Sequence, residues 1–230
     1  MRSVAGAHVI VTNGVVGTSG FGNHKHNDLL SFDYRIGPRP LIVDPGSYAY
    51  TGDPDMRNLL RSTASHNTLR VDGAEQNDFK PEWLFRMFET SRAETVSFSD
   101  AADVAEYVGR HHGYERLADP VTHERTLRLS KRSGALDIVD RLSGRGTHDL
   151  LWHFHLAPGV AVEPGEHGMR LTAPGLEARL RFDSALHSAI EPAWYSPSYG
   201  VRLACAAINL TLRAAVDGER TWAFSVEPVS

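Results

Sequence analysis

The stretch that decides the fold reads HERTLRL over residues 123–129, SKRSG over 130–134 and ALDIVD over 135–140. The first run alternates polar and apolar side chains, which is the period of a strand with one buried face. The middle run is rich in polar residues and ends in glycine, which is typical of a hairpin loop. The third run is then the returning strand, so the stretch predicts an antiparallel β-hairpin.

Similar short runs follow one another along the rest of the chain. Leu41–Val43 ends at the turn Asp44-Pro45-Gly46, and Asn67–Val71 ends at Asp72-Gly73. Later strand candidates are 150–156, 169–172, 176–182, 201–212 and 221–226. Many short strands without long helical periods predict an all-β fold, an antiparallel stacked-sheet sandwich of the super-sandwich type with few short helical turns. The one helix candidate is Asp55–Arg61, capped by Asp53 and Pro54.

Turn residues suggest one internal boundary. Pro158-Gly159 and Glu163-Pro164-Gly165 separate a main β-sandwich domain at 1–157 from a remaining β layer at 158–230. That layer is either part of the same domain or a small C-terminal β subdomain, because a simple loop explains the same residues.

Composition excludes several classes of protein. The net charge of −4 argues against a general binder of nucleic acid or of membrane surfaces. No apolar run approaches the roughly 20 residues that a membrane-spanning helix needs, and the first residues lack the apolar core of a signal peptide. Cys205 is the only cysteine, so the chain has no internal disulfide. Oligomeric state is not readable from the sequence.

Histidines and a carboxylate form the candidate site. His24 and His26 are separated by one residue, and an extended chain would point both to one face. Asp44 and His66 follow at separations that suit neighbouring strands or turns. Two imidazoles and a carboxylate are a plausible set of Zn²⁺ ligands, which leaves one histidine within a side chain of the metal.

Several motifs in order resemble one family. They are GNHKHNDLLSF at 22–32, DPGSYAY at 44–50, RSTASHNT at 61–68 and VDGAEQ at 71–76, with weaker echoes at 114–117, 123–127 and 152–156. This order resembles the heparinase II/III-type polysaccharide lyases. Those bacterial enzymes join an N-terminal α/α toroid to a C-terminal antiparallel β-sandwich, and this chain resembles the second part. The resemblance implies a periplasmic or secreted location.

The resemblance also assigns roles to residues. His24 would be catalytic, and His26, Asp44 and His66 would hold a zinc ion that is chiefly structural. The implied reaction is β-elimination on a uronic-acid-containing polysaccharide. The implied partners are an acidic polysaccharide and the N-terminal toroid.

Four further residues complete the predicted substrate-binding set: Tyr50, Arg57, Arg61 and Asn67. The arginines would form charge-assisted hydrogen bonds to acidic sugars, although a solvated helix face explains their spacing as well. Tyr50 would stack on a sugar ring. His153 and His155, a second His-x-His pair, are predicted to lie on a solvated sheet face.

Two other functions fit parts of the pattern. One is a non-catalytic carbohydrate-binding module. The other is a cupin-like metal oxygenase, because two histidines, a carboxylate and a later histidine also hold Fe²⁺. A cupin, however, needs a glutamate soon after the first pair, where this chain has Asp28 and Asp33.

Overall fold

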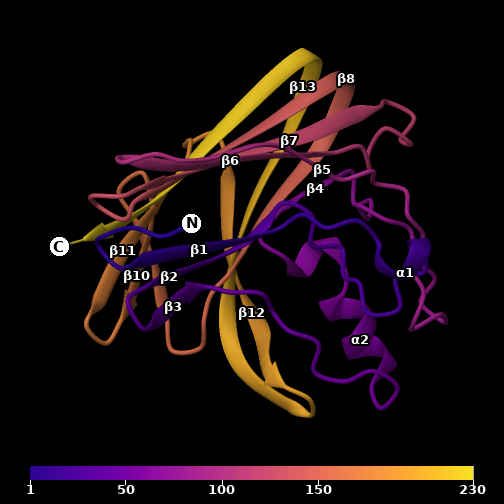
Figure 1. Cartoon of the computed structure of the whole chain (residues 1–230), viewed down its shortest axis with the longest axis horizontal. Helices are drawn as coiled ribbons and strands as arrows, with labels where there is room; N and C mark the ends of the chain where they lie inside the picture. Colours follow the sequence, from indigo (N-terminus) through magenta and orange to yellow (C-terminus); the bar gives the residue numbers. More distant parts are fainter. Residues whose placement is uncertain (230) are drawn as a thin grey trace.

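The computed structural model describes residues 1–229 and consists of two antiparallel β-sheets that do not close into a barrel. The smaller sheet has the order β1 (Ala7–Thr12), β2 (Ser31–Ile36) and β3 (Arg39–Ile42). The larger sheet runs β5 (Glu94–Asp100), β6 (Val104–His111), β7 (Val121–Ser130), β8 (Leu136–His155), β13 (Val201–Val229), β11 (Leu176–Arg181), β10 (Gly168–Ala173) and β9 (Ala161–Gly165). In addition, β12 (His187–Ser198) pairs with β13, and β4 (Leu69–Val71) pairs with β8. The predicted all-β, stacked-sheet class is confirmed (Figure 1).

The predicted hairpin is present at the centre of the larger sheet. Strands β7 and β8 pair antiparallel, with Leu129 opposite Leu136 and Arg125 opposite Asp140. The loop between them is held to the smaller sheet, because the Tyr34 hydroxyl donates to the Gly134 carbonyl at 2.6 Å. Buried and exposed positions alternate through most of both strands, as the sequence predicted.

Two strands are much longer than expected. The candidates at 135–140 and 150–156 are one strand, β8, and those at 201–212 and 221–226 are one strand, β13. These two strands pair continuously from Ala207 opposite His155 to Val226 opposite Leu136. The glycines at 144, 146 and 218 lie within the paired region, where the ladder continues through them. Tertiary pairing therefore overrides the local turn signal.

The helices gather with the long loops at one end of the molecule (Figure 1). They are α1 (Gly17–Gly20), α2 (Pro54–Leu60) and the 3-10 turn η1 (Thr63–Ser65). The helix predicted at 55–61 is confirmed within one residue, and the Asp53 carboxylate accepts from the Met56 amide at 3.1 Å. No helix in residues 1–229 is long and apolar enough to cross a membrane.

One buried core lies between the smaller sheet and the larger sheet. It includes Val9 and Phe32 of the smaller sheet, Ile138 of β8, and Leu171 and Val226 beyond residue 157. This continuity favours the alternative in which 158–230 belongs to the same domain, while the boundary itself stays a prediction.

A buried ionic network joins the hairpin to the loops. The Arg125 guanidinium donates to both carboxylate oxygens of Asp140, at 2.7 and 2.6 Å. His123 lies 2.8 Å from the same carboxylate, and the Trp152 indole donates to it at 2.9 Å. All four side chains are buried. Burial alone would raise the pKa of the Asp140 carboxyl, but Arg125 and His123 hold it well below its usual range.

We expect Asp140→Asn to lower the free energy of unfolding by about 3–5 kcal/mol at pH 7, because it leaves Arg125 buried without its counterion. Since the folded pKa of Asp140 is depressed, its contribution is complete above the unfolded pKa of about 4 and declines as the pH falls below it. Urea unfolding at about pH 7 and pH 3 measures both effects. The control is Asp137→Asn, an exposed carboxylate on the same strand. Equal stability of both variants at pH 7 would contradict this assignment.

Candidate functional site

Three side chains distant in sequence meet at the end of the molecule that carries the helices. His26 lies in the loop before β2, Asp44 follows the end of β3, and His66 ends η1. One potential ligand atom from each residue lies within 4.8 Å of the other two. The His66 Nδ1 is 2.9 Å from Asp44 Oδ2, and the two imidazole centroids are 5.3 Å apart. The structure therefore brings the three predicted ligands together.

The charges of the three groups are linked. Burial opposes the charged form of His66, but the Asp44 carboxylate raises its pKa above the usual value. Burial, and then the charge on His66, lower the pKa of His26 to about 3. The His66 and His26 imidazoles hold the pKa of Asp44 below its usual range against the effect of burial. A neutral imidazole and a carboxylate are the forms that bind a metal ion.

The residues present fit a metal ion. The Nε2 atom of His66 is buried and has no hydrogen-bond partner among the described residues, so it is a ligand atom without another role. Two nitrogens and a carboxylate oxygen suit Zn²⁺. The Asp44 side chain is 42% exposed, and it lines a groove of about 840 Å³. The Arg57 Nη1 lies 2.7 Å from His26 Nε2, so a metal on that nitrogen would have to replace this contact.

A tight turn fixes Asp44. The Gly46 amide donates to Asp44 Oδ1 at 2.8 Å, and Gly46 has a φ of +79°. A Cβ atom at Gly46 would overlap the carbonyl oxygen of Ser196 on β12. The Ser196 amide in turn donates to the carbonyl of Pro45. The Pro-Gly motif is therefore needed both for its backbone conformation and for its close approach to a second strand.

Asn67 positions two of the three ligands. Its amide nitrogen donates to the carbonyls of Phe32 and Val43, both at 2.9 Å, and its oxygen accepts from the His155 amide at 2.6 Å. Val43 precedes Asp44, and Asn67 itself follows His66. Because the side chain is buried and its bonds are made inside the protein, we leave Asn67 out of the proposed substrate contacts. The Arg125 Nη1 donates to the Asn67 carbonyl at 2.6 Å, which links this residue to Asp140.

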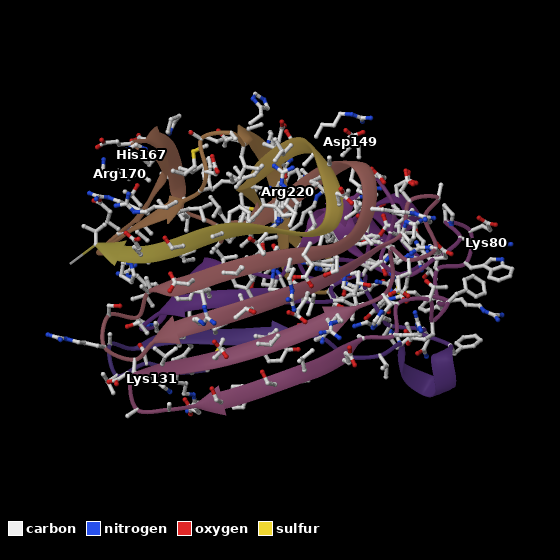
Figure 2. The ribbon with its side chains drawn as sticks, turned by 90° about the horizontal axis from the view of Figure 1, so that it is seen from above. Lys80, Lys131, Asp149, His167, Arg170 and Arg220 are labelled. Carbon is white, nitrogen blue, oxygen red and sulfur yellow. The ribbon has the colours of Figure 1, made fainter. Side chains whose placement is uncertain are left out.

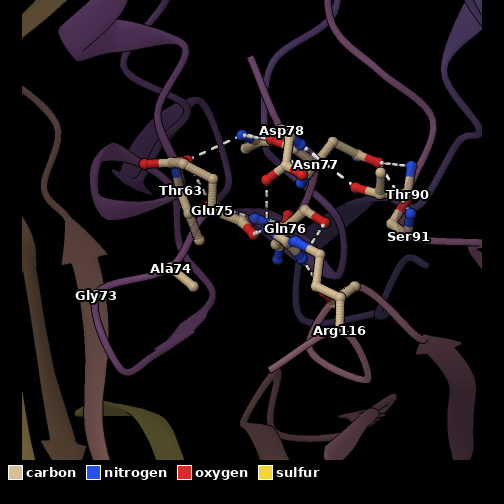
Figure 3. A network of polar contacts seen from close by, with 12 residues as sticks. Thr63, Gly73, Ala74, Glu75, Gln76, Asn77, Asp78, Thr90, Ser91 and Arg116 are labelled. Carbon is tan, nitrogen blue, oxygen red and sulfur yellow. Dashed lines mark hydrogen bonds and ion pairs between the residues drawn. The ribbon is translucent and has the colours of Figure 1, made fainter. Parts of the chain in front are cut away.

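A second polar network, centred on Glu75, Gln76 and Asn77 (Figure 3), also holds the loop that carries His26. Asn27 donates to the Glu75 carboxylate at 2.8 Å and accepts from the Asn77 amide at 2.9 Å. Glu75 also accepts from the Thr63 amide at 2.7 Å, at the start of the turn before His66. Gln76 exchanges two bonds with the backbone of Leu29, at 2.8 and 2.9 Å. The motif at 71–76 thus joins the loops of two candidate ligands.

His24 and His26 do not share a face. Residues 22–28 form turns rather than a strand, so the expected alternation does not apply, and His24 is exposed while His26 is buried. The His24 ring lies edge-on to Tyr50 and Phe85, with centroids 5.3 and 6.1 Å away. Sequence reasoning gave no reason to include Phe85, because it comes from a loop without periodicity.

Arg57 in α2 and Arg61 at its C-terminal cap are buried instead of solvated. Arg57 lies over the Tyr50 ring at 5.1 Å, and its Nε and Nη2 atoms have no hydrogen-bond partner among the described residues. Arg61 donates to the carbonyls of Lys80, Trp83, Leu84 and Arg86 at 3.1–3.3 Å. These bonds hold a loop in place, so we also leave Arg61 out of the proposed substrate contacts.

His153 and His155 are buried, contrary to the prediction of a solvated sheet face. The loop that carries Asp44 covers this part of β8, since the Val43 amide donates to the His155 carbonyl at 2.9 Å. Burial lowers the pKa values of these two histidines to about 3 and about 4.

The fold and this site define a β-sandwich domain with a His–Asp–His cluster. The chain belongs to the family described as Heparinase II/III-like, C-terminal, whose model matches residues 1–225. No curated protein matches the chain.

Solved structures share the fold. The heparan sulfate lyase HepC from Pedobacter heparinus is 19% identical with a TM-score of 0.78, over 96% of this chain and 33% of that one. A structure of heparinase III is 16% identical with a TM-score of 0.78, over 98% of this chain and 34% of that one. A 4-alpha-glucanotransferase from Thermococcus litoralis is 11% identical with a TM-score of 0.52, over 97% and 39%. The chain therefore spans about a third of the length of these heparinase structures.

We expect Gly46→Ala to destabilise the protein by more than Gly159→Ala. Both glycines have φ near +80°, which costs an alanine roughly 1–2 kcal/mol, but only Gly46 faces a backbone atom within contact distance. Thermal unfolding of the two variants gives the comparison. Equal losses would show that the approach to Ser196 is not needed.

Proposed function

We propose that the chain is the C-terminal β-sandwich portion of a lyase that cleaves a uronic-acid-containing polysaccharide by β-elimination. The observation that carries this proposal is the difference between two neighbouring histidines. His26 is buried in the three-residue cluster, whereas His24, two residues earlier, is exposed beside aromatic rings. Family membership supports the same function.

His24 is the proposed general base. In β-elimination a base takes the proton α to the uronate carboxylate, the electron pair forms the C4–C5 double bond, and the C4–oxygen bond breaks. The released oxygen takes up a proton. An imidazole suits the first step because its ordinary pKa lies near neutral pH. Tyr50, whose ring faces His24, is proposed to stack on a sugar.

Arg57 is proposed to supply the positive charge that neutralises the substrate carboxylate. Its guanidinium lies against Tyr50, and its Nε and Nη2 nitrogens have no hydrogen-bond partner among the described residues. A buried cation without an anion is unfavourable, and an acidic sugar would supply that anion. Because Arg57 is covered in this chain, the contact requires a side-chain movement around Tyr50.

Zinc is the proposed cofactor, held by His26, Asp44 and His66 with a chiefly structural role. When bound, it would cross-link three loops and neutralise the carboxylate of Asp44. The chain's own contribution is to fix the backbone two residues from His24. The remaining catalytic groups are proposed to come from an N-terminal helical toroid in a longer protein.

We expect His24→Ala, in a longer protein that includes the helical part, to lower the rate of cleavage by about 10²–10⁴-fold. The chain alone should show little or no turnover. Absorbance of the unsaturated uronate ends measures both rates. The matched control is His167→Ala, an exposed histidine at the opposite end of the molecule from Lys80 (Figure 2). Full activity of the His24 variant would rule out its catalytic role.

We expect the chain to bind one Zn²⁺ and Asn67→Ala to weaken that binding by about 10–100-fold, because Asn67 orients the backbone beside two ligands. Competition with a chelator measures the affinity, and the control is Asn13→Ala, a half-buried asparagine whose amide donates to the Glu94 carbonyl and to none of the three loops. Binding of redox-active iron in place of zinc would favour the cupin-like alternative.

A non-catalytic carbohydrate-binding module is the second candidate. The exposed aromatic side chains near His24, such as Phe85 and Tyr199, favour it. It predicts that His24→Ala leaves cleavage by the longer protein unchanged.

A further inference from the structure

The segment Phe79–Phe88 carries an unusual concentration of exposed aromatic side chains. Trp83 and Phe85 are each 39% exposed, and Phe21, from the loop after α1, is 47% exposed beside them. Exposed aromatic side chains gathered on one segment in this way mark a candidate binding surface. We call residues 79–88 together with Phe21 the aromatic ridge.

Two cations lie on these rings. The Arg86 guanidinium is 5.4, 5.3 and 4.9 Å from the ring centroids of Phe21, Trp83 and Phe88. The Lys80 Nζ is 4.6 Å from the Trp83 ring. Glu82 is the one acidic residue within 79–88, so this segment carries a net positive charge.

The ridge is held in a fixed shape although it has no helix or strand. Buried Arg61 donates to four of its carbonyls and stacks on the Phe79 ring at 4.0 Å. Asn58 adds a bond to the Pro81 carbonyl at 3.0 Å. A surface whose backbone is held by Asn58 and Arg61 in this way is preorganised, which lowers the entropic cost of binding.

The ridge is continuous with the candidate catalytic residue. Phe85 lies 6.1 Å from the His24 ring and 5.9 Å from the Tyr50 ring. Tyr50 in turn lies 6.1 Å from Tyr199, which is 66% exposed. Neighbouring aromatic rings therefore extend from Phe85, in the same segment as Trp83, past His24 and Tyr50 to Tyr199.

We propose that the aromatic ridge is a subsite for an acidic polysaccharide chain, with Trp83 and Phe85 facing sugar rings and Lys80 and Arg86 contacting carboxylate or sulfate groups. Arg61 is its positioning residue. The proposal rests on the proposed function and extends it to substrate units on one side of His24. An exposed lysine on the Trp83 ring argues for an anionic ligand, since protein–protein interfaces are depleted of lysine.

Calorimetric titration of the chain with a heparan sulfate oligosaccharide tests the subsite. We expect Trp83→Ala to weaken binding by about tenfold or more. We expect the double variant Lys80→Gln and Arg86→Gln to weaken it similarly and to reduce its dependence on salt. The matched controls are Phe98→Ala, an exposed aromatic on β5, and Arg170→Gln, at the opposite end of the molecule from Lys80 (Figure 2). Neither control should change the affinity more than about twofold.

The role of Arg61 is tested by measuring whether its effect on binding affinity adds to that of Trp83. Arg61→Lys keeps the charge but cannot reach four carbonyls, so it should weaken binding as much as Trp83→Ala does. Combining the two should add little, because both remove the same surface. A purely structural role of Arg61 predicts additive losses instead.

Two results would overturn the subsite. One is undetectable binding by the unsubstituted chain, and the other is unchanged affinity in both ridge variants, as expected if the ridge contacts another part of a longer protein. Neither result bears on the loss of cleavage expected for His24→Ala, so the subsite and the lyase function fail separately.

Discussion

The ion pair between Arg125 and Asp140 is the constraint on which the site depends. A buried pair is favourable only when its remaining hydrogen-bonding groups are satisfied, and here Trp152, His123 and two backbone carbonyls satisfy them. One of those carbonyls belongs to Asn67. The pair therefore does more than join β7 to β8, because it anchors the loop that follows His66. From Asn67 the same chain of bonds reaches the backbone next to Asp44.

This arrangement holds the three candidate ligands rigidly and leaves His24 beside them exposed. The three candidate ligands lie in loops, where the sheet imposes no register, yet side-chain bonds from Asn67, Glu75 and Gln76 replace the missing backbone ladder. Only one residue separates His26, at the buried end of this network, from exposed His24. A rigid support with an exposed reactive group is the general requirement of a catalytic or binding site.

The arginines of α2 show how one short helix serves two loops. Arg57 faces the cluster and Tyr50, whereas Arg61, one turn later, faces the segment that contains Phe85. Their spacing of four residues places both on one side of the helix. Both side chains are buried because the loops at 44–50 and 79–88 close over that side, which no feature of the helix itself reveals.

The sequence by itself determined the all-β class, the β7–β8 hairpin, the cap of α2 and a group of candidate ligands, among which the family resemblance singled out His26, Asp44 and His66. Alternation, turn residues and capping are local, so neighbouring residues are enough to specify them. The family resemblance added the order of the motifs, and its weak echoes at 123–127 and 152–156 contain Arg125 and Trp152 without indicating what they do. Only the tertiary structure decided that His24 and His26 face different ways, that Asn67 and Arg61 bond to backbone, and that β8 and β13 run unbroken through their glycines. Burial and long-range hydrogen bonds depend on residues that lie far apart in the sequence and meet only when the loops and sheets pack together, so no short stretch of sequence reveals them.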